Sequence, residues 1–146
     1  MVCLGNICRS PIVHGIMAEI SLNSFVDSAG TGSYHIGSPP DPRSIQVAQD
    51  NGIDISHQIA RQFKSSDFTK FDHIFVMDRQ NYRDVIAKAN RQGDIDKVEL
   101  LCKAARSGVC PVPDPYYGGD EGFQNVFDLV KTACHRIAEQ WNESHE

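Results

Sequence analysis

The sequence lacks the features of membrane, secreted and nucleic-acid-binding proteins. Its hydrophobic runs are far shorter than the roughly 20 residues of a transmembrane helix, and no signal-peptide pattern opens it. Its 14 basic and 19 acidic residues give a net charge of −5, and no basic stripe is present. This balance argues against nucleic acid as a partner. The composition, with 40% hydrophobic and 23% charged residues, is typical of a globular protein. A length of 146 residues fits one domain with one core.

The sequence also lacks repeats, linkers and low-complexity segments, and it has few cysteines. The five cysteines are an odd number without the spacing of a secreted disulfide framework. Neither Cys3 and Cys8 nor Cys102 and Cys110 have the about two to four intervening residues of a structural zinc site. We therefore expect a cytoplasmic protein with reduced thiols and no bound metal.

The most informative segment is a short loop bounded by Cys3 and Arg9. A five-residue arc can curl so that its backbone N–H groups surround one phosphate. Gly5 allows a close backbone approach and positive φ, and Asn6 tolerates left-handed geometry. Arg9 offers a planar guanidinium that matches two phosphate oxygens. The spacing therefore predicts a phosphate-binding loop with a cysteine in its floor, formed by Leu4, Gly5, Asn6, Ile7 and Cys8.

A helix is predicted to begin directly after this loop, at Ser10 and Pro11. Serine is a favoured N-cap, and proline is favoured at the first helical position. The partial positive charge of a helix N-terminus favours both a phosphate dianion and a Cys3 thiolate. Taken alone, the motif also fits a buried cysteine at a strand end before a capped helix.

Alternating hydrophobic and amphipathic segments predict an α/β fold. We expect a single-domain, doubly wound sheet of four parallel strands with helices on both faces, in flavodoxin-like order. Ligands bind beyond the carboxyl ends of the strands of such a sheet, which is where the loop after Cys3 lies. The first predicted strand ends at Cys3, and the other three span 25–27, 73–77 and 97–101. The predicted helices span 10–22, 65–70, 79–90 and 121–142, and a further one runs from Asp41-Pro42 to Gly52. Loops are predicted over 29–42 and 102–120.

The predicted first strand is unusually short. Only Met1 and Val2 precede Cys3, and two residues are too few for a central strand. We therefore expect one domain over residues 1–146 whose first strand is truncated at the N-terminus.

A second motif lies far downstream, at Asp114-Pro115-Tyr116-Tyr117-Gly118-Gly119. Together with the Cys3 loop it resembles the signature of the low-molecular-weight protein tyrosine phosphatase family. Matching segments cover essentially the whole chain: Asp27-Ser28-Ala29-Gly30-Thr31, Pro40-Asp41-Pro42-Arg43, Gly52-Ile53, His57 through Arg61-Gln62, Phe71-Asp72 and Met77-Asp78.

The resemblance implies an enzyme that hydrolyses phosphotyrosine, and small aryl phosphates like an acid phosphatase, through a phosphocysteine intermediate. Cys3 is expected to attack phosphorus, and Arg9 to hold the phosphoryl oxygens. Ser10 is expected to donate a hydrogen bond to the Cys3 thiolate. Asp114 resembles the general acid that later activates water as a base. An Asp-Pro turn is the alternative interpretation of Asp114.

The resemblance also assigns the walls of a substrate pocket. Tyr116 and Tyr117 are expected to sandwich an aromatic ring. Tyr34 matches a further wall position, although an exposed turn tyrosine is often inert. Ile7 stands where a branch of the family that acts on phosphoarginine has a hydroxyl residue, so Ile7 favours phosphotyrosine.

Supporting and redox residues follow from the same family pattern. Asn6, Ser28 and His57 match a hydrogen-bond network that holds the strained turn of the loop. Cys8 is expected to trap an oxidised Cys3 as a reversible disulfide, although a small buried hydrophobe is the alternative. The implied partners are tyrosine-phosphorylated proteins, with phosphate and other oxyanions as inhibitors. No cofactor is expected, and the chain is expected to be mostly monomeric with weak self-association.

Two other functions remain open at this stage. An arsenate reductase on the same fold would pass oxidation to two further cysteines, and Cys102 and Cys110 are separated by seven residues, one more than the usual relay. Thiol consumption on adding arsenate would identify it. A catalytically dead phosphotyrosine-binding module would lack turnover of p-nitrophenyl phosphate.

Overall fold

The protein contains a four-stranded, all-parallel sheet. The computed structural model describes residues 1–21, 23–106, 111–116 and 120–144. The strand order is β2-β1-β3-β4, and Val2 pairs with both Ala29 and Val76. This confirms the predicted doubly wound sheet and its order. The strands are β1 (Val2–Cys3), β2 (Ala29–Gly30), β3 (Ile74–Val76) and β4 (Val98–Leu100).

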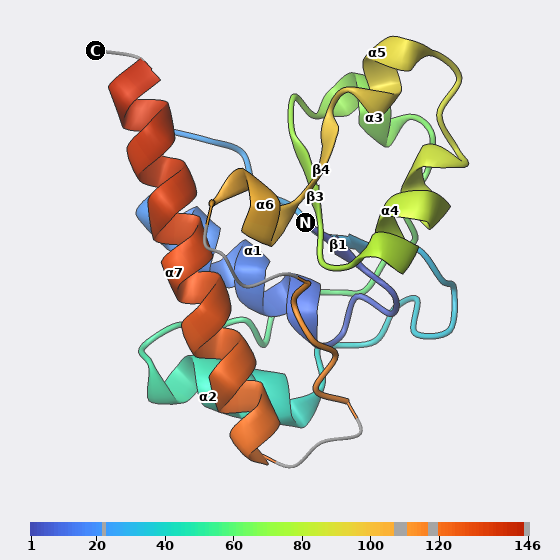
Figure 1. Ribbon diagram of the computed structural model, residues 1–146. Helices are drawn as coiled ribbons and strands as arrows, with labels where there is room; N and C mark the ends of the chain where they lie inside the picture. The colour runs from blue at the N-terminus through green and yellow to red at the C-terminus, as the bar shows by residue number, and fades with distance from the viewer. Residues whose placement is uncertain (22, 107–110, 117–119, 145–146) are drawn as a thin grey trace.

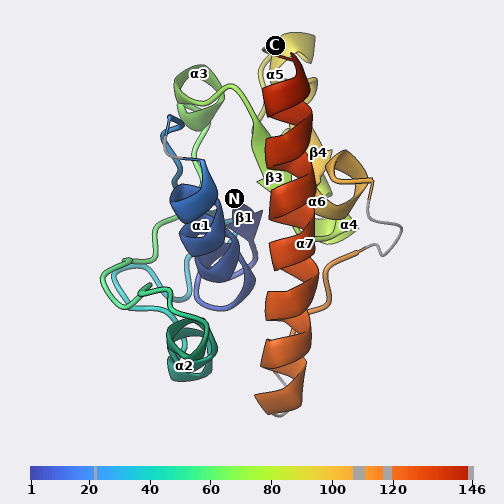
Figure 2. The same ribbon diagram turned by 90° about the vertical axis from the view of Figure 1, so that its left-hand side faces the viewer.

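Helices cover both faces of this sheet (Figure 1). Helices α1, α2 and α7 lie on one side, with α1 packed against α7, and α3 and α4 lie on the other (Figures 1 and 2). No helix in the described part of the chain is long and apolar enough to cross a membrane. The helices are α1 (Arg9–Ile20), α2 (Pro42–Asp50), α3 (Asp67–Lys70), α4 (Arg79–Ile86), α5 (Gln92–Ile95), α6 (Leu101–Ala104) and α7 (Asp120–Ser144).

The core has two parts, one on each face of the sheet. Successive side chains of a strand point to opposite faces. Ile74 and Val76 therefore join the cluster with α3 and α4, whereas Phe75 and Met77 join the cluster with α1 and α7. Cys3 belongs to the second cluster, which places its sulfur beneath the start of α1. The inward stripe of α7 packs in the second cluster: Phe123, Val126, Phe127, Val130, Cys134 and Ile137 are buried and Trp141 is partly buried.

One predicted strand is wrong. Residues 25–27 are not a strand, because pairing with β1 begins only at Val2 and Ala29. Ahead of that pair, the Asp27 carbonyl accepts a hydrogen bond from the Met1 amine, and its carboxylate binds Arg61. Phe25 is exposed and stacks on the Phe71 ring instead.

Two helix predictions also needed correction. The N-cap of α1 is Cys8 rather than Ser10, because the Ser10 hydroxyl bonds to side chains of the loop. The predicted loop 102–120 begins within a short helix, α6, and α5 was not predicted. The second helix agrees with its prediction: Asp41 is the N-cap, and Gly52, with a φ of 81°, follows its end.

Candidate active site

The Cys3 sulfur lies at the centre of a buried hydrogen-bond network. Cys3 Sγ is 3.1 Å from Ser10 Oγ, and Asn6 Nδ2 donates to Ser10 Oγ at 2.8 Å. The amide nitrogen can only donate, so the Ser10 hydroxyl accepts from Asn6, and its own hydrogen stays available for Cys3 Sγ. The predicted contact between Ser10 and Cys3 is thus present.

Asn6 holds the turn of the loop. Its φ is 58°, the left-handed geometry expected for it, whereas Gly5 does not have the positive φ expected for glycine. Glycine at position 5 instead allows the His35 ring to lie close to the backbone, because a Cβ there would be 3.0 Å from that ring. The Asn6 side chain stabilises the strained backbone through three hydrogen bonds. It donates to Ser10 Oγ and, at 3.0 Å, to Ser28 Oγ, and it accepts from the Arg61 amide at 3.0 Å.

The carbonyls of the loop are held from outside. Leu4 O accepts from the Gly32 amide at 2.9 Å, and Ile7 O accepts from the Asp41 amide at 2.8 Å. Cys8 O accepts from Ser44 Oγ at 3.2 Å. By contrast, the amides of residues 5–8 donate to no group in the described part of the chain. Outward carbonyls and uncommitted amides are what an anion-binding loop requires.

Arg9 is fixed by two groups that the sequence analysis did not assign to the site. Its Nη1 donates to Asp78 Oδ2 at 2.7 Å and to Val112 O at 3.1 Å. Only 3% of the Arg9 side chain is exposed. Asp78 follows β3 and caps α4 by accepting from the Asn81 amide. Because β3 is next to β1, the carboxyl end of β3 could have indicated Asp78.

Asp114 lies at the mouth of the loop. Its Oδ2 is 3.8 Å from Arg9 Nη2, and 43% of its side chain is exposed. Its Oδ1 accepts from the Tyr116 amide at 3.0 Å, so the turn that was the alternative interpretation is also present. The segment is anchored to the sheet because the Val112 amide donates to Met77 O at 2.9 Å.

His14, not His57, completes the network beside the loop. His14 Nδ1 is 3.1 Å from Ser28 Oγ, whereas His57 is exposed. Burial lowers the pKa of His14, with Asp27 acting in the opposite direction. The neutral imidazole can then accept the Ser28 hydroxyl hydrogen. His14 follows Ser10 by one helical turn on α1, and this spacing could have revealed it.

The predicted pocket walls are only partly described. Tyr34 is 79% exposed, and a Cβ at Gly32 would lie 2.8 Å from its ring, so the ring covers Gly32 beside the loop. Tyr116 is 39% exposed on the Asp114 segment. Ile7 is half-buried in the loop itself. Tyr117 lies outside the described residues.

The cysteines occupy different environments. Burial, followed by the nearby Asp41 and Cys3, raises the pKa of the Cys8 thiol to about 12. Cys134 is buried in the core and its thiol is free, as are those of Cys3 and Cys8. Cys102, buried on α6, is disulfide-bonded, which departs from the reduced thiols expected from composition. Cys110 lies outside the described residues, so the reductase alternative depends on the arsenate experiment.

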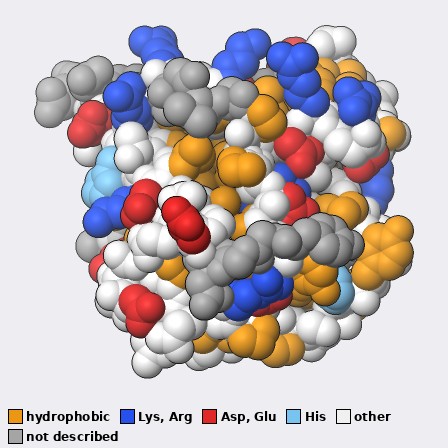
Figure 3. Space-filling view, turned by 60° about the horizontal axis from the view of Figure 1, so that its bottom comes forward, with side chains coloured by type: hydrophobic (Ala, Val, Ile, Leu, Met, Phe, Trp, Pro, Cys, Tyr) orange, Lys and Arg blue, Asp and Glu red, His pale blue; other side chains and the backbone are white. Residues whose placement is uncertain are grey.

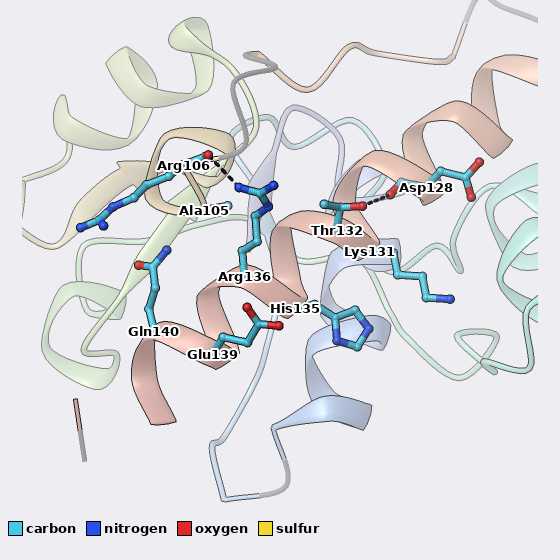
Figure 4. A pocket seen from close by; sticks show the side chains of 9 residues that line it. All are labelled: Ala105, Arg106, Asp128, Lys131, Thr132, His135, Arg136, Glu139 and Gln140. Carbon is cyan, nitrogen blue, oxygen red and sulfur yellow. Dashed lines mark hydrogen bonds between the residues drawn. The ribbon is translucent and has the colours of Figure 1, made fainter. Parts of the chain in front are cut away.

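On the face shown in Figure 3, acidic and basic groups are interspersed with hydrophobic ones. A hollow of about 760 Å³ lies elsewhere, along α6 and α7, between Ala105 and Gln140 (Figure 4). Arg136 there donates to the Arg106 carbonyl at 3.0 Å. None of the residues that line the hollow belongs to the phosphate-binding loop, so the two lie on separate parts of the surface.

A cysteine in an anion-binding loop at a helix start, with arginine and aspartate over it, defines a cysteine-dependent phosphate monoesterase on a doubly wound sheet. The family described as low molecular weight phosphotyrosine protein phosphatase matches residues 1–146. The chain belongs to that family.

Individual relatives agree with this assignment. The low molecular weight phosphotyrosine protein phosphatase of Schizosaccharomyces pombe is 43% identical over 134 residues, which cover 86% of this chain and 85% of that protein. A protein tyrosine phosphatase from Entamoeba histolytica superposes with a TM-score of 0.91 at 36% identity, covering 99% of this chain and 96% of that one. Wzb from Vibrio vulnificus, in complex with benzylphosphonate, superposes with a TM-score of 0.88 at 30% identity. The match covers 95% of this chain and 94% of that one.

Proposed function

We propose that this protein hydrolyses phosphotyrosine, and small aryl phosphates, through a phosphocysteine intermediate. The single observation that carries the proposal is the contact of Cys3 Sγ with the Ser10 hydroxyl, 3.1 Å from sulfur to oxygen, in a loop whose carbonyls are held outward. This arrangement places the Cys3 sulfur directly below a phosphate-binding cradle. Family membership is consistent with the same chemistry.

In the first step, Cys3 attacks phosphorus while the loop amides and Arg9 hold the three phosphoryl oxygens. The sulfur–phosphorus bond forms and the bond to the phenolic oxygen breaks. Asp114 donates its carboxyl proton to that oxygen, so the leaving group departs as a neutral phenol. Arg9 and the amides stabilise the charge of the transition state.

In the second step, water cleaves the phosphocysteine. The Asp114 carboxylate takes a proton from the attacking water, and the sulfur–phosphorus bond breaks. The departing Cys3 thiolate regains the Ser10 hydrogen bond. Inorganic phosphate is then released, and it is expected to inhibit by occupying the same cradle.

Aromatic walls are proposed to select the substrate. Tyr116 and Tyr34 are exposed beside the loop, and Tyr117 is the third proposed wall residue. A phenyl ring can stack on tyrosine rings while carrying phosphorus to Cys3, whereas a serine stem is too short. Benzylphosphonate, bound to the V. vulnificus relative, is an aryl compound of this shape.

In the Asp114→Asn enzyme, the loss of kcat/KM is expected to depend on the leaving group of the substrate. We expect kcat/KM for phenyl phosphate to fall by roughly a hundred to ten thousand times, because the phenolate must leave without a proton. The loss is expected to shrink for 2,4-dinitrophenyl phosphate, whose leaving group needs no proton. Equal losses for both substrates would show that Asp114 is not the general acid.

Peroxide is expected to inactivate the enzyme reversibly through a Cys3–Cys8 disulfide. Cys3 would be oxidised first, because the raised pKa of Cys8, about 12, keeps that sulfur protonated and less reactive. The Cys8→Ser enzyme is expected to lose activity as fast but to recover poorly with thiol, and Cys134→Ala serves as the control. Peptide mass spectrometry pairing Cys3 with Cys102 or Cys110 would favour a reductase-like relay instead.

Tyrosine-phosphorylated proteins are the proposed partners, and the cytoplasm is the proposed location. A reducing compartment keeps the thiols of Cys3 and Cys8 available for this reaction. A mostly monomeric state with weak self-association is part of the same proposal. The direct experiment on substrates is capture of bound phosphoproteins by the Cys3→Ser variant.

A further inference from the structure

Arg43, at the start of α2, contacts the segment that carries Asp114. Its guanidinium carbon lies 5.5 Å from the centroid of the Tyr116 ring and 4.5 Å from that of Phe123, which is buried on α7. Both distances are within the range of cation–π attraction. Tyr116 in turn donates its amide hydrogen to Asp114 Oδ1 at 3.0 Å.

The opposite side of Arg43 is fixed to the phosphate-binding loop through Asp41. Arg43 Nε and Nη2 each lie 3.1 Å from a different Asp41 carboxylate oxygen, a two-point contact that only a guanidinium makes. The Asp41 amide donates to Ile7 O at 2.8 Å, and the Ser44 hydroxyl donates to Cys8 O. The start of α2 therefore connects the cradle to the Asp114 segment.

We propose that Arg43 is a positioning residue that holds Tyr116, and through it Asp114, at a fixed place over the phosphate-binding loop. The inference rests on the proposed phosphatase activity. The Asp114 segment lies on the surface, and the Tyr116 side chain is partly exposed, so contacts from below must set its position. Arg43 contacts the Tyr116 ring, and Arg43 is itself held by the Asp41 carboxylate and by the Phe123 ring.

Methionine at position 43 keeps a long side chain but removes the guanidinium. We expect kcat/KM of Arg43→Met for phenyl phosphate to fall by about tenfold, because a small displacement of the acid slows proton transfer. The loss for 2,4-dinitrophenyl phosphate is expected to stay below about threefold. The inhibition constant of inorganic phosphate is expected to be unchanged, because Arg43 does not line the cradle.

Two further variants separate positioning from folding. Arg43→Lys keeps a cation but loses the two-point contact with Asp41, and we expect the same selective loss at smaller size. Gln46→Ala, on an exposed position of the same helix, is the matched control and is expected to behave as wild type. Thermal melting of each variant shows whether it is folded.

A double-mutant cycle tests whether Arg43 acts through Tyr116. In a Tyr116→Leu background, Arg43→Met is expected to cause little further loss for phenyl phosphate. A full additional loss, equal losses for both substrates, or a weakened inhibition by phosphate would overturn the role of Arg43. Wild-type protein without aryl phosphatase activity would instead overturn the proposed function itself, so the two failures are distinguishable.

Discussion

The Cys3→Ser enzyme is expected to lose essentially all turnover of p-nitrophenyl phosphate, on the order of a hundred-thousandfold or more, while still binding phosphate. A serine hydroxyl at the floor of the loop has far too little alkoxide to attack phosphorus. The loop amides and Arg9 are untouched by the change, so the cradle keeps its affinity for the anion. Steady-state kinetics and calorimetric titration with phosphate measure the two effects separately.

Cys134→Ala is the matched control for this prediction. Cys134 is also a buried free thiol, but it lies on α7 in the core and away from the loop. Its replacement is expected to leave turnover near the wild-type value. Near-normal activity of Cys3→Ser would end the interpretation of Cys3 as the nucleophile.

Lysine in place of Arg9 is expected to slow the chemical step by on the order of a hundredfold or more, although the charge is kept. The guanidinium of Arg9 bonds to Asp78 and to the Val112 carbonyl while offering its other nitrogen to the mouth of the loop. One ammonium group cannot make these contacts and also span two phosphoryl oxygens. Single-turnover burst kinetics with p-nitrophenyl phosphate reports this step directly.

Arg83→Lys is the control for Arg9→Lys, because Arg83 is exposed on α4 and the one hydrogen bond described for its side chain goes to Gln80. Melting curves of both variants test whether the buried pair of Arg9 with Asp78 is needed for folding. An Arg9→Lys enzyme slowed by less than a few-fold would contradict the role of a bidentate phosphate ligand.

The phosphate-binding loop could be predicted because its chemistry is contiguous in the chain. Cys3, Asn6, Arg9 and Ser10 lie within eight consecutive positions, so their spacing alone constrains how they can meet. The sheet order could be predicted for a related reason, since alternating strands and helices leave few topologies. Asp114 was found only because its motif resembles that of a known family.

Residues that act through tertiary contacts could not be predicted in the same way. Asp78 reaches Arg9 from a neighbouring strand end, 69 positions along the chain, and nothing in its local sequence specifies that partner. Arg43 was part of a recognised segment, but its contact with Tyr116 depends on how α2 and α7 pack. His57 was assigned by resemblance, whereas the helical position of His14 decides which imidazole reaches Ser28.

The contact between Arg9 and the Val112 carbonyl joins residues 103 positions apart. Closing so long a stretch of chain carries a large entropic cost, which is recovered only when the intervening strands and helices have packed. Arg9 is therefore oriented at the end of folding rather than at its beginning. Enzymatic activity in this protein is consequently a measure of the cooperative native state, and a partly folded chain that retains the Cys3 loop is expected to be inactive.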